Sequence, residues 1–95
     1  MKQHSVRINL EEGLQARNTT ALVRHALGYD CDIMVGKEDR WVDGKSLMGM
    51  MNLHGRKHEW LTLVTDGKEE ATAMDALTAF LTTASSPKTG YSGSS

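Results

Sequence analysis

Apolar and polar residues alternate in several short stretches of this chain, a period of two that is typical of a strand buried on one face. These stretches are residues 5–10, residues 31–35, the run Arg40-Trp41-Val42 and residues 60–65. Turn-forming residues separate them: Gly36 to Asp39 stand between the second and the third, and Asp66-Gly67 follows the last. The pattern predicts four strands, of which the middle two form a hairpin.

Three other stretches carry apolar residues at helical spacing. Their apolar positions are Leu22, Val23, Ala26 and Leu27 in the first, Leu47, Met48, Met50, Met51 and Leu53 in the second, and Met74, Leu77, Phe80 and Leu81 in the third. Gly28 follows the first stretch as a C-terminal cap, and Ser46 precedes the second as an N-cap, although Gly49 weakens that helix. Glu69 and Glu70 precede the third, where negative charge favours a helix start. Three helices are therefore expected.

The predicted order is strand, helix, strand, strand, helix, strand, helix, without an internal repeat. A chain of 95 residues supports one compact domain. We predict an α+β open-faced sandwich over residues 1–83, with a four-stranded, mainly antiparallel sheet covered on one face by three helices. Residues 84–95 offer almost nothing to bury, so we expect a disordered tail.

Composition narrows the classes of function. The formal net charge is −1, which gives no global attraction to the phosphates of nucleic acid. The single cysteine, Cys31, forms no intramolecular disulfide, and no apolar leader follows Met1. We expect a cytoplasmic protein that contacts neither nucleic acid nor membrane directly.

Three segments together resemble the histidine phosphocarrier protein family, HPr, in the family's order and spacing. They are Gly13-Leu14-Gln15-Ala16-Arg17, the run Lys45-Ser46-Leu47-Met48-Gly49-Met50-Met51, and the Asp66-Gly67 turn with the helix after it. The resemblance covers roughly residues 2 to 82 and implies the sandwich predicted above. It also implies a place in the bacterial sugar phosphotransferase and carbon catabolite control network.

Gln15 stands where the resemblance implies the histidine that accepts phosphate. An imidazole has a nucleophilic ring nitrogen, whereas the lone pair of an amide nitrogen is delocalised into its carbonyl. Phosphotransfer through this position is therefore not expected, and the chain is not expected to be an enzyme. Within the family, the Crh type carries the same glutamine and is phosphorylated on serine, and this chain resembles that type most.

Ser46 is the phosphorylation site that the resemblance implies. The sequence alone favours a plain N-cap, since serine is among the commonest caps, and the resemblance is what points to phosphorylation. The resemblance also implies a partner-binding surface of Gln15, Arg17, Ser46, Leu47, Met48 and Met51. Taken alone, Arg17 reads as a solvated side chain, and Met50 or Met51 as core.

Three residues depart from the family pattern. Asn18 replaces the family's proline after the arginine, and it could cap a first helix that starts later, leaving Gln15 to Arg17 in a loop. His54 and His58 stand where glycine is usual. Their spacing of four could bind a metal on a helix, but no third ligand is evident nearby, so neither a metal nor a cofactor is expected.

Two classes of function follow. The preferred one is a signalling protein, phosphorylated on Ser46 by a kinase like HPr kinase/phosphorylase and then bound by a LacI-type catabolite control repressor. The alternative is a degenerate phosphocarrier that uses another histidine, or an inert competitor that occupies phosphotransferase-system enzymes. Self-association into a homodimer is a further expectation.

Overall fold

The computed structural model describes residues 1–83, and the tail predicted at residues 84–95 lies outside them. The elements are β1 (Lys2–Arg7), α1 (Ala16–Leu27), β2 (Asp32–Lys37), β3 (Arg40–Asp43), α2 (Leu47–Leu53), β4 (Trp60–Asp66) and α3 (Glu70–Thr82). The predicted order of strands and helices is confirmed.

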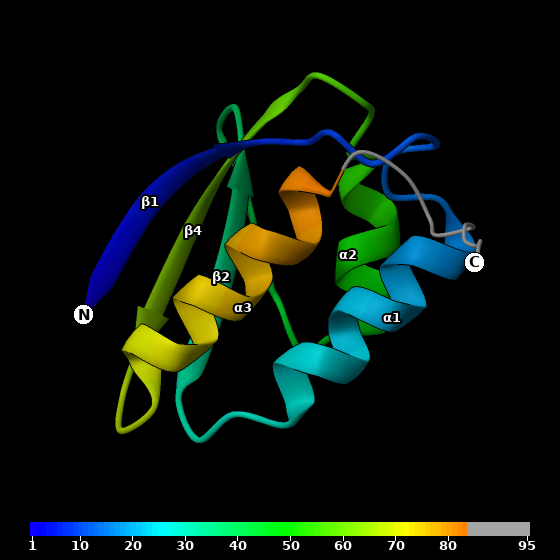
Figure 1. Ribbon diagram of the computed structural model, residues 1–95. Coiled ribbons are helices and arrows are strands. Elements are labelled where there is room, and N and C mark those ends of the chain that lie inside the picture. Colours follow the sequence, from blue (N-terminus) through cyan, green and yellow to red (C-terminus); the bar gives the residue numbers. More distant parts are fainter. Residues whose placement is uncertain (84–95) are drawn as a thin grey trace, which may run out of the picture.

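The four strands form one sheet in the order β1-β4-β2-β3, and each neighbouring pair is antiparallel. All three helices lie on the same side of this sheet (Figure 1). This arrangement is the predicted α+β open-faced sandwich, with the other face of the sheet left without a helical layer.

The core lies between the sheet and the helices and follows the period-two pattern of the strands. On β4, Leu61, Leu63 and Thr65 are buried, whereas Trp60, the first residue of the strand, is exposed. Thr65 is tolerated in the core because its hydroxyl donates a 2.8 Å hydrogen bond to the carbonyl of Glu70 at the start of α3. The face of β4 toward the helices is thus apolar with one satisfied polar group.

Two details of the predicted elements are wrong. The first strand covers Lys2–Arg7 rather than residues 5–10, because beyond Arg7 the chain leaves the β1–β4 ladder. Ile8 and Leu10 remain buried, and the amide of Asn9 donates to the carbonyl of Leu81 instead of to a strand. Leu27 is 61% exposed, because it ends α1 just past the stripe that packs on the core.

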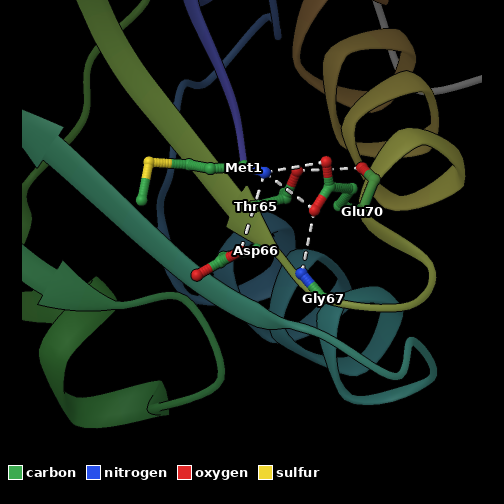
Figure 2. A network of polar contacts seen from close by, with 5 residues as sticks. All are labelled: Met1, Thr65, Asp66, Gly67 and Glu70. Atoms are coloured by element: carbon green, nitrogen blue, oxygen red, sulfur yellow. Dashed lines mark hydrogen bonds and ion pairs between the residues drawn. The ribbon is translucent and has the colours of Figure 1, made fainter.

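A network of polar contacts holds the corner between β4 and α3 (Figure 2). The carboxylate of Glu70 accepts hydrogen bonds from the amide of Gly67 at 3.0 Å and from the amine of Met1 at 2.9 and 3.0 Å. The Gly67 hydrogen bond, followed by the bond from the amine, lowers the pKa of Glu70 below its ordinary value. These contacts tie the start of β1 to the first turn of α3.

Candidate functional site

The first helix begins at Ala16, with Gln15 as its N-cap residue. The alternative of a later start, capped by Asn18, does not hold, because Asn18 lies inside the first turn and its side chain hydrogen-bonds to the preceding loop. Its Nδ2 donates a 2.7 Å hydrogen bond to the carbonyl of Gly13. Gln15 is therefore presented at the positive end of a helix rather than in a loose segment.

The loop before α1 packs directly on the segment after α2. Gly13 has a φ of +62°, and a Cβ there would lie 2.8 Å from the carbonyl oxygen of Gly55, so only glycine fits. The amide of Leu14 donates to that same carbonyl at 2.7 Å, and the hydroxyl of Thr19 donates to the carbonyl of Leu14 at 2.8 Å. Position 15 is held by backbone contacts on both sides.

A surface pocket of about 370 Å³ lies beside Gln15. It is lined by Glu12, Leu14, Gln15, Ala16, Met51, His54, Gly55 and Arg56. The side chain of Gln15 does not hydrogen-bond to the backbone N–H groups at the start of α1, and the first turn has no acidic residue. The positive end of this helix is therefore not neutralised by a side chain of its own first turn. Such a surface favours a negatively charged group of a ligand or partner.

The sequence analysis placed Gln15 and Met51 on one surface, and the structure brings them together in this pocket. Arg17 lies exposed in the first turn of α1 and is not among the lining residues. His54 and Arg56 were not expected at the site. The close approach that Gly13 and Gly55 allow between their two loops carries these side chains toward Gln15, and no spacing in the sequence reveals it.

The contribution of Asn18 can be measured by stability. Asn18→Ala removes a hydrogen bond that is partly buried and should cost about 1 kcal/mol, which lowers the melting temperature by roughly 4–8 °C in a domain of this size. Asn18→Asp, which keeps the shape but has no donor, should lose at least as much. An unchanged melting temperature in both variants would show that the Gly13 contact does not hold the loop.

The predicted cap of the second helix is confirmed. Ser46 is the N-cap residue of α2, and its Oγ accepts a 3.1 Å hydrogen bond from the amide of Gly49. Glycine is a poor helix former, but a larger residue at position 49 would be crowded, because a Cβ there would lie 3.3 Å from both Ser46 Oγ and Val42. The glycine leaves room around the serine oxygen.

The second helix has one buried and one exposed side. Met50 and Leu53 are fully buried, which answers the open question for Met50. Leu47, Met48 and Met51 are 40%, 71% and 40% exposed. These three form an apolar strip, here called the α2 strip, that runs from Ser46 to the pocket beside Gln15.

The C-terminal end of α2 is held by cations from the β2–β3 hairpin, which the sequence analysis did not foresee. Lys37 Nζ donates to the carbonyl of His54 at 2.8 Å, and Arg40 donates to the carbonyl of Asn52. Lys37 also pairs with Glu59 at 2.9 Å, and this contact lowers the pKa of the Glu59 carboxyl. The helix that carries Ser46 is thus fixed at both ends.

Residues 1–83 contain no cluster of three or more side chains arranged to hold a metal ion. His54 and His58 both have positive φ, 55° and 77°, and neither is inside a helix. Their positive φ agrees with positions where glycine is usual. Within the same residues, no helix is long and apolar enough to cross a membrane.

The fold and the two helix starts define a class of small phosphocarrier-like proteins, and comparison with known families agrees. The family model described as the PTS HPr component phosphorylation site matches residues 2–83. The chain belongs to the HPr family.

Its relatives include the HPr-like protein Crh of Halalkalibacterium halodurans, which is 37% identical over 85% of this chain and 96% of the relative. A crystal structure of the phosphocarrier protein HPr from Bacillus anthracis matches with a TM-score of 0.83, at 34% identity over 84% of this chain and 95% of that chain. A Crh structure from Bacillus subtilis, described as a domain-swapped dimer, matches with a TM-score of 0.68 at 33% identity over 85% of this chain and 93% of that chain.

Proposed function

We propose that this chain is a regulatory HPr-like protein of the Crh type, which carries a signal by phosphorylation of Ser46 and does not transfer phosphate through a histidine. The contrast between its two helix starts carries the proposal. Gln15 caps α1 beside the pocket, whereas the half-buried Ser46 caps α2 through its hydroxyl oxygen. The first position lacks a nucleophile for phosphotransfer, and the second retains an oxygen that a kinase can modify.

The surroundings of Ser46 favour signalling without refolding. The serine oxygen already faces the amide of Gly49, so a phosphate group there meets backbone N–H donors at the start of α2. A phosphate adds a charge of about −2 next to the exposed Leu47 and Met48. The modified surface combines a charge with apolar contact area, which suits protein recognition.

The proposed partners follow from that surface. A kinase like HPr kinase/phosphorylase modifies Ser46, and a LacI-type catabolite control repressor binds the phosphorylated form through the α2 strip and Gln15. Arg17, exposed on the adjoining turn of α1, contributes a planar cation for a carboxylate or phosphate. The domain-swapped Crh relative supports homodimer formation as a second mode of association.

The alternative is a degenerate phosphocarrier that uses another histidine. His54 is the histidine that lines the Gln15 pocket, but it is the C-cap of α2 rather than the N-cap of a helix. It therefore lacks the unpaired backbone N–H groups that a helix start, such as that of α1, offers to a phosphoryl group. The observation therefore favours the regulatory function, with binding to phosphotransferase-system enzymes as competition only.

A kinase assay tests the proposal. Incubation with HPr kinase/phosphorylase and ATP should add a single phosphate, seen by intact mass and mapped to Ser46 by peptide fragmentation. Ser46→Ala should remain unmodified, while Thr72→Ala, which changes an exposed hydroxyl on α3, should be modified like the parent chain. Modification of Ser46→Ala to the same extent would contradict the assignment.

A further inference from the structure

The face of the sheet opposite the helices carries exposed side chains that the proposed function leaves unused. Residues that alternate with the buried ones along β2 and β4 are the exposed or half-buried ones, and they lie on the side of the sheet away from the helical layer. We call this surface the uncovered sheet face and define it by Asp32, Met34, Trp41, Asp43, Trp60 and Asp66. All six are exposed.

One end of this face is acidic. Asp32 on β2 and Asp66 on β4 are direct cross-strand partners, and Asp43 on β3 is the partner of Met34 on β2. Like charges opposite each other in a sheet are destabilising, so an aspartate pair at this position costs stability in the free protein. The Met1 amine, 3.6 Å from Asp66, offsets part of that cost, and a further cation beside Asp32 would offset more.

The carboxylates surround a surface pocket of about 310 Å³ whose lining also includes Met34 and Val64. Two ammonium groups line it as well, and the shortest contact of each is with a group outside the pocket. Lys45 Nζ donates to the carbonyl of Tyr29 at 2.8 Å. The Met1 amine forms its shorter ion pair with Glu70 at 2.9 Å and a longer one with Asp66 at 3.6 Å (Figure 2). Negative charge and apolar surface therefore adjoin in one pocket.

The other end of the face is aromatic. Trp41 and Trp60 are the only tryptophans of the chain and are 50% and 61% exposed. The indole of Trp41 lies against Gly36, where a Cβ would come within 2.9 Å of the ring, so the glycine lets the ring rest on β2. Faces of exposed indoles attract Lys and Arg side chains.

We propose that the uncovered sheet face docks a basic segment of a partner protein, in which Lys or Arg side chains alternate with apolar ones. Two independent features, the three aspartates and the two indoles, match the same cationic chemistry, and Met34 with Val64 offers apolar contact between them. Arg7, the cross-strand partner of Trp60, contributes the positive charge found among the outward-facing residues of the strands, against the three aspartates. The face therefore complements a positive partner.

The length of the segment follows from the strands. Trp60 and Asp66 are the two ends of β4, so six residue steps separate the aromatic from the acidic end. At the rise of a strand this distance is about 20 Å, which an extended peptide of roughly six residues spans. Because α2 lies on the opposite face of the sheet, such a segment leaves Ser46 and the α2 strip free (Figure 1).

Intrinsic fluorescence tests the proposal without a label, because both tryptophans belong to this face. The probe is an eight-residue peptide of alternating arginine and leucine, with capped ends, titrated into the full chain. We expect a saturable change in tryptophan emission that weakens as salt is added. The matched peptide of alternating glutamate and leucine should bind at least tenfold more weakly, because the aspartates of the face repel its glutamates at several contacts.

Charge-matched variants locate the site. Asp32→Asn should weaken binding about threefold, and Asp32→Asn with Asp66→Asn about tenfold, because exposed ion pairs are individually weak. Asp75→Asn removes the same charge from exposed α3 on the helical side and should leave the affinity unchanged. Relief of the aspartate pair should keep or raise the melting temperature of Asp32→Asn, so that lost binding is not lost folding.

Amide chemical shifts give a readout independent of fluorescence. Bound arginine–leucine peptide should shift the amides of β2, β3 and β4 and leave those of α2 in place. Equal affinity for the two peptides, an equal effect of Asp75→Asn and Asp32→Asn, or shifts confined to α2 would each overturn the proposal.

Discussion

Incubated with phosphoenolpyruvate and the general phosphotransfer enzyme, the purified chain is expected to gain no phosphate. Gln15 occupies the N-cap of α1, where its amide nitrogen lacks a free lone pair and forms no phosphoramidate. The four histidines of the chain are not expected to accept phosphate in its place, since none of them is placed at the start of a helix. Intact mass measured at neutral pH, where a phosphohistidine survives, reports the outcome.

Restoring the nucleophile should restore transfer. Because α1 begins at Ala16 with Asn18 in place, Gln15→His puts an imidazole at the positive end of a helix and beside the pocket. We expect this variant to gain acid-labile phosphate, whereas Gln15→Asn, an amide of shorter reach, should not. Asn18→Pro added to Gln15→His should leave the start of α1 intact, since the amide of residue 18 lies in the first turn and needs no helical partner. It should still cost about 1 kcal/mol of stability, because the side-chain bond to Gly13 is lost.

Stoichiometric labelling of the parent chain at any histidine would contradict the prediction and favour the degenerate phosphocarrier. Failure of Gln15→His to gain phosphate would show instead that the surroundings of position 15 no longer accept the phosphotransfer enzyme. His54 and Arg56 line the pocket next to this position and are the residues to change next.

The fold followed from the sequence wherever burial repeats with the period of a single element. The alternation of Leu61 and Leu63 predicted β4 because every second residue of that strand enters the core. Residues near the ends of elements were less predictable. Ile8 and Leu10 continue the alternation after β1 has ended. Ile8 still exchanges backbone hydrogen bonds with Glu59 and His58 just before β4, whereas the amide of Asn9 already donates to the carbonyl of Leu81 on α3.

The site was predictable only in part, for a related reason. Ser46 and its cap could be read locally, since the serine oxygen bonds an amide three residues further on. The Gln15 pocket depends on two loops about 40 residues apart in the chain, joined by the bond from Leu14 to Gly55. Asn18 left the start of α1 open, because its side chain suits either the cap of a helix or a bond to a loop carbonyl, and only the three-dimensional contact with Gly13 decides between them.

Phosphorylation of Ser46 is expected to raise the affinity for the repressor-type partner about tenfold or more. One charge-assisted hydrogen bond contributes about 1.5–3 kcal/mol, which corresponds to that change in the dissociation constant. The phosphate needs no rearrangement, because Ser46 Oγ already faces the amide of Gly49 and α2 is held at its other end by Lys37 and Arg40. The far-ultraviolet circular dichroism of the two forms should therefore be nearly identical.

Variants on either side of the phosphate separate charge from contact area. Ser46→Ala should abolish regulated binding and cost about 1 kcal/mol of stability through the lost cap. Leu47→Ala and Met48→Ala should weaken docking of the phosphorylated form without preventing its phosphorylation, because both side chains are exposed beside the cap. Leu27→Ala is the matched control and should bind like the parent chain. It shortens an exposed leucine at the C-terminal end of α1, the end opposite Gln15.

Calorimetric titration of the phosphorylated and unmodified chains against the repressor measures the switch directly. Equal affinities would reject it, even if the kinase modifies Ser46, and would leave the serine as a structural cap of α2. A tighter phosphorylated complex that loses affinity with Leu47→Ala but not with Leu27→Ala would place the contact on the α2 strip. The charge at the helix start would then act as the signal, with the apolar strip as the surface through which it is recognised.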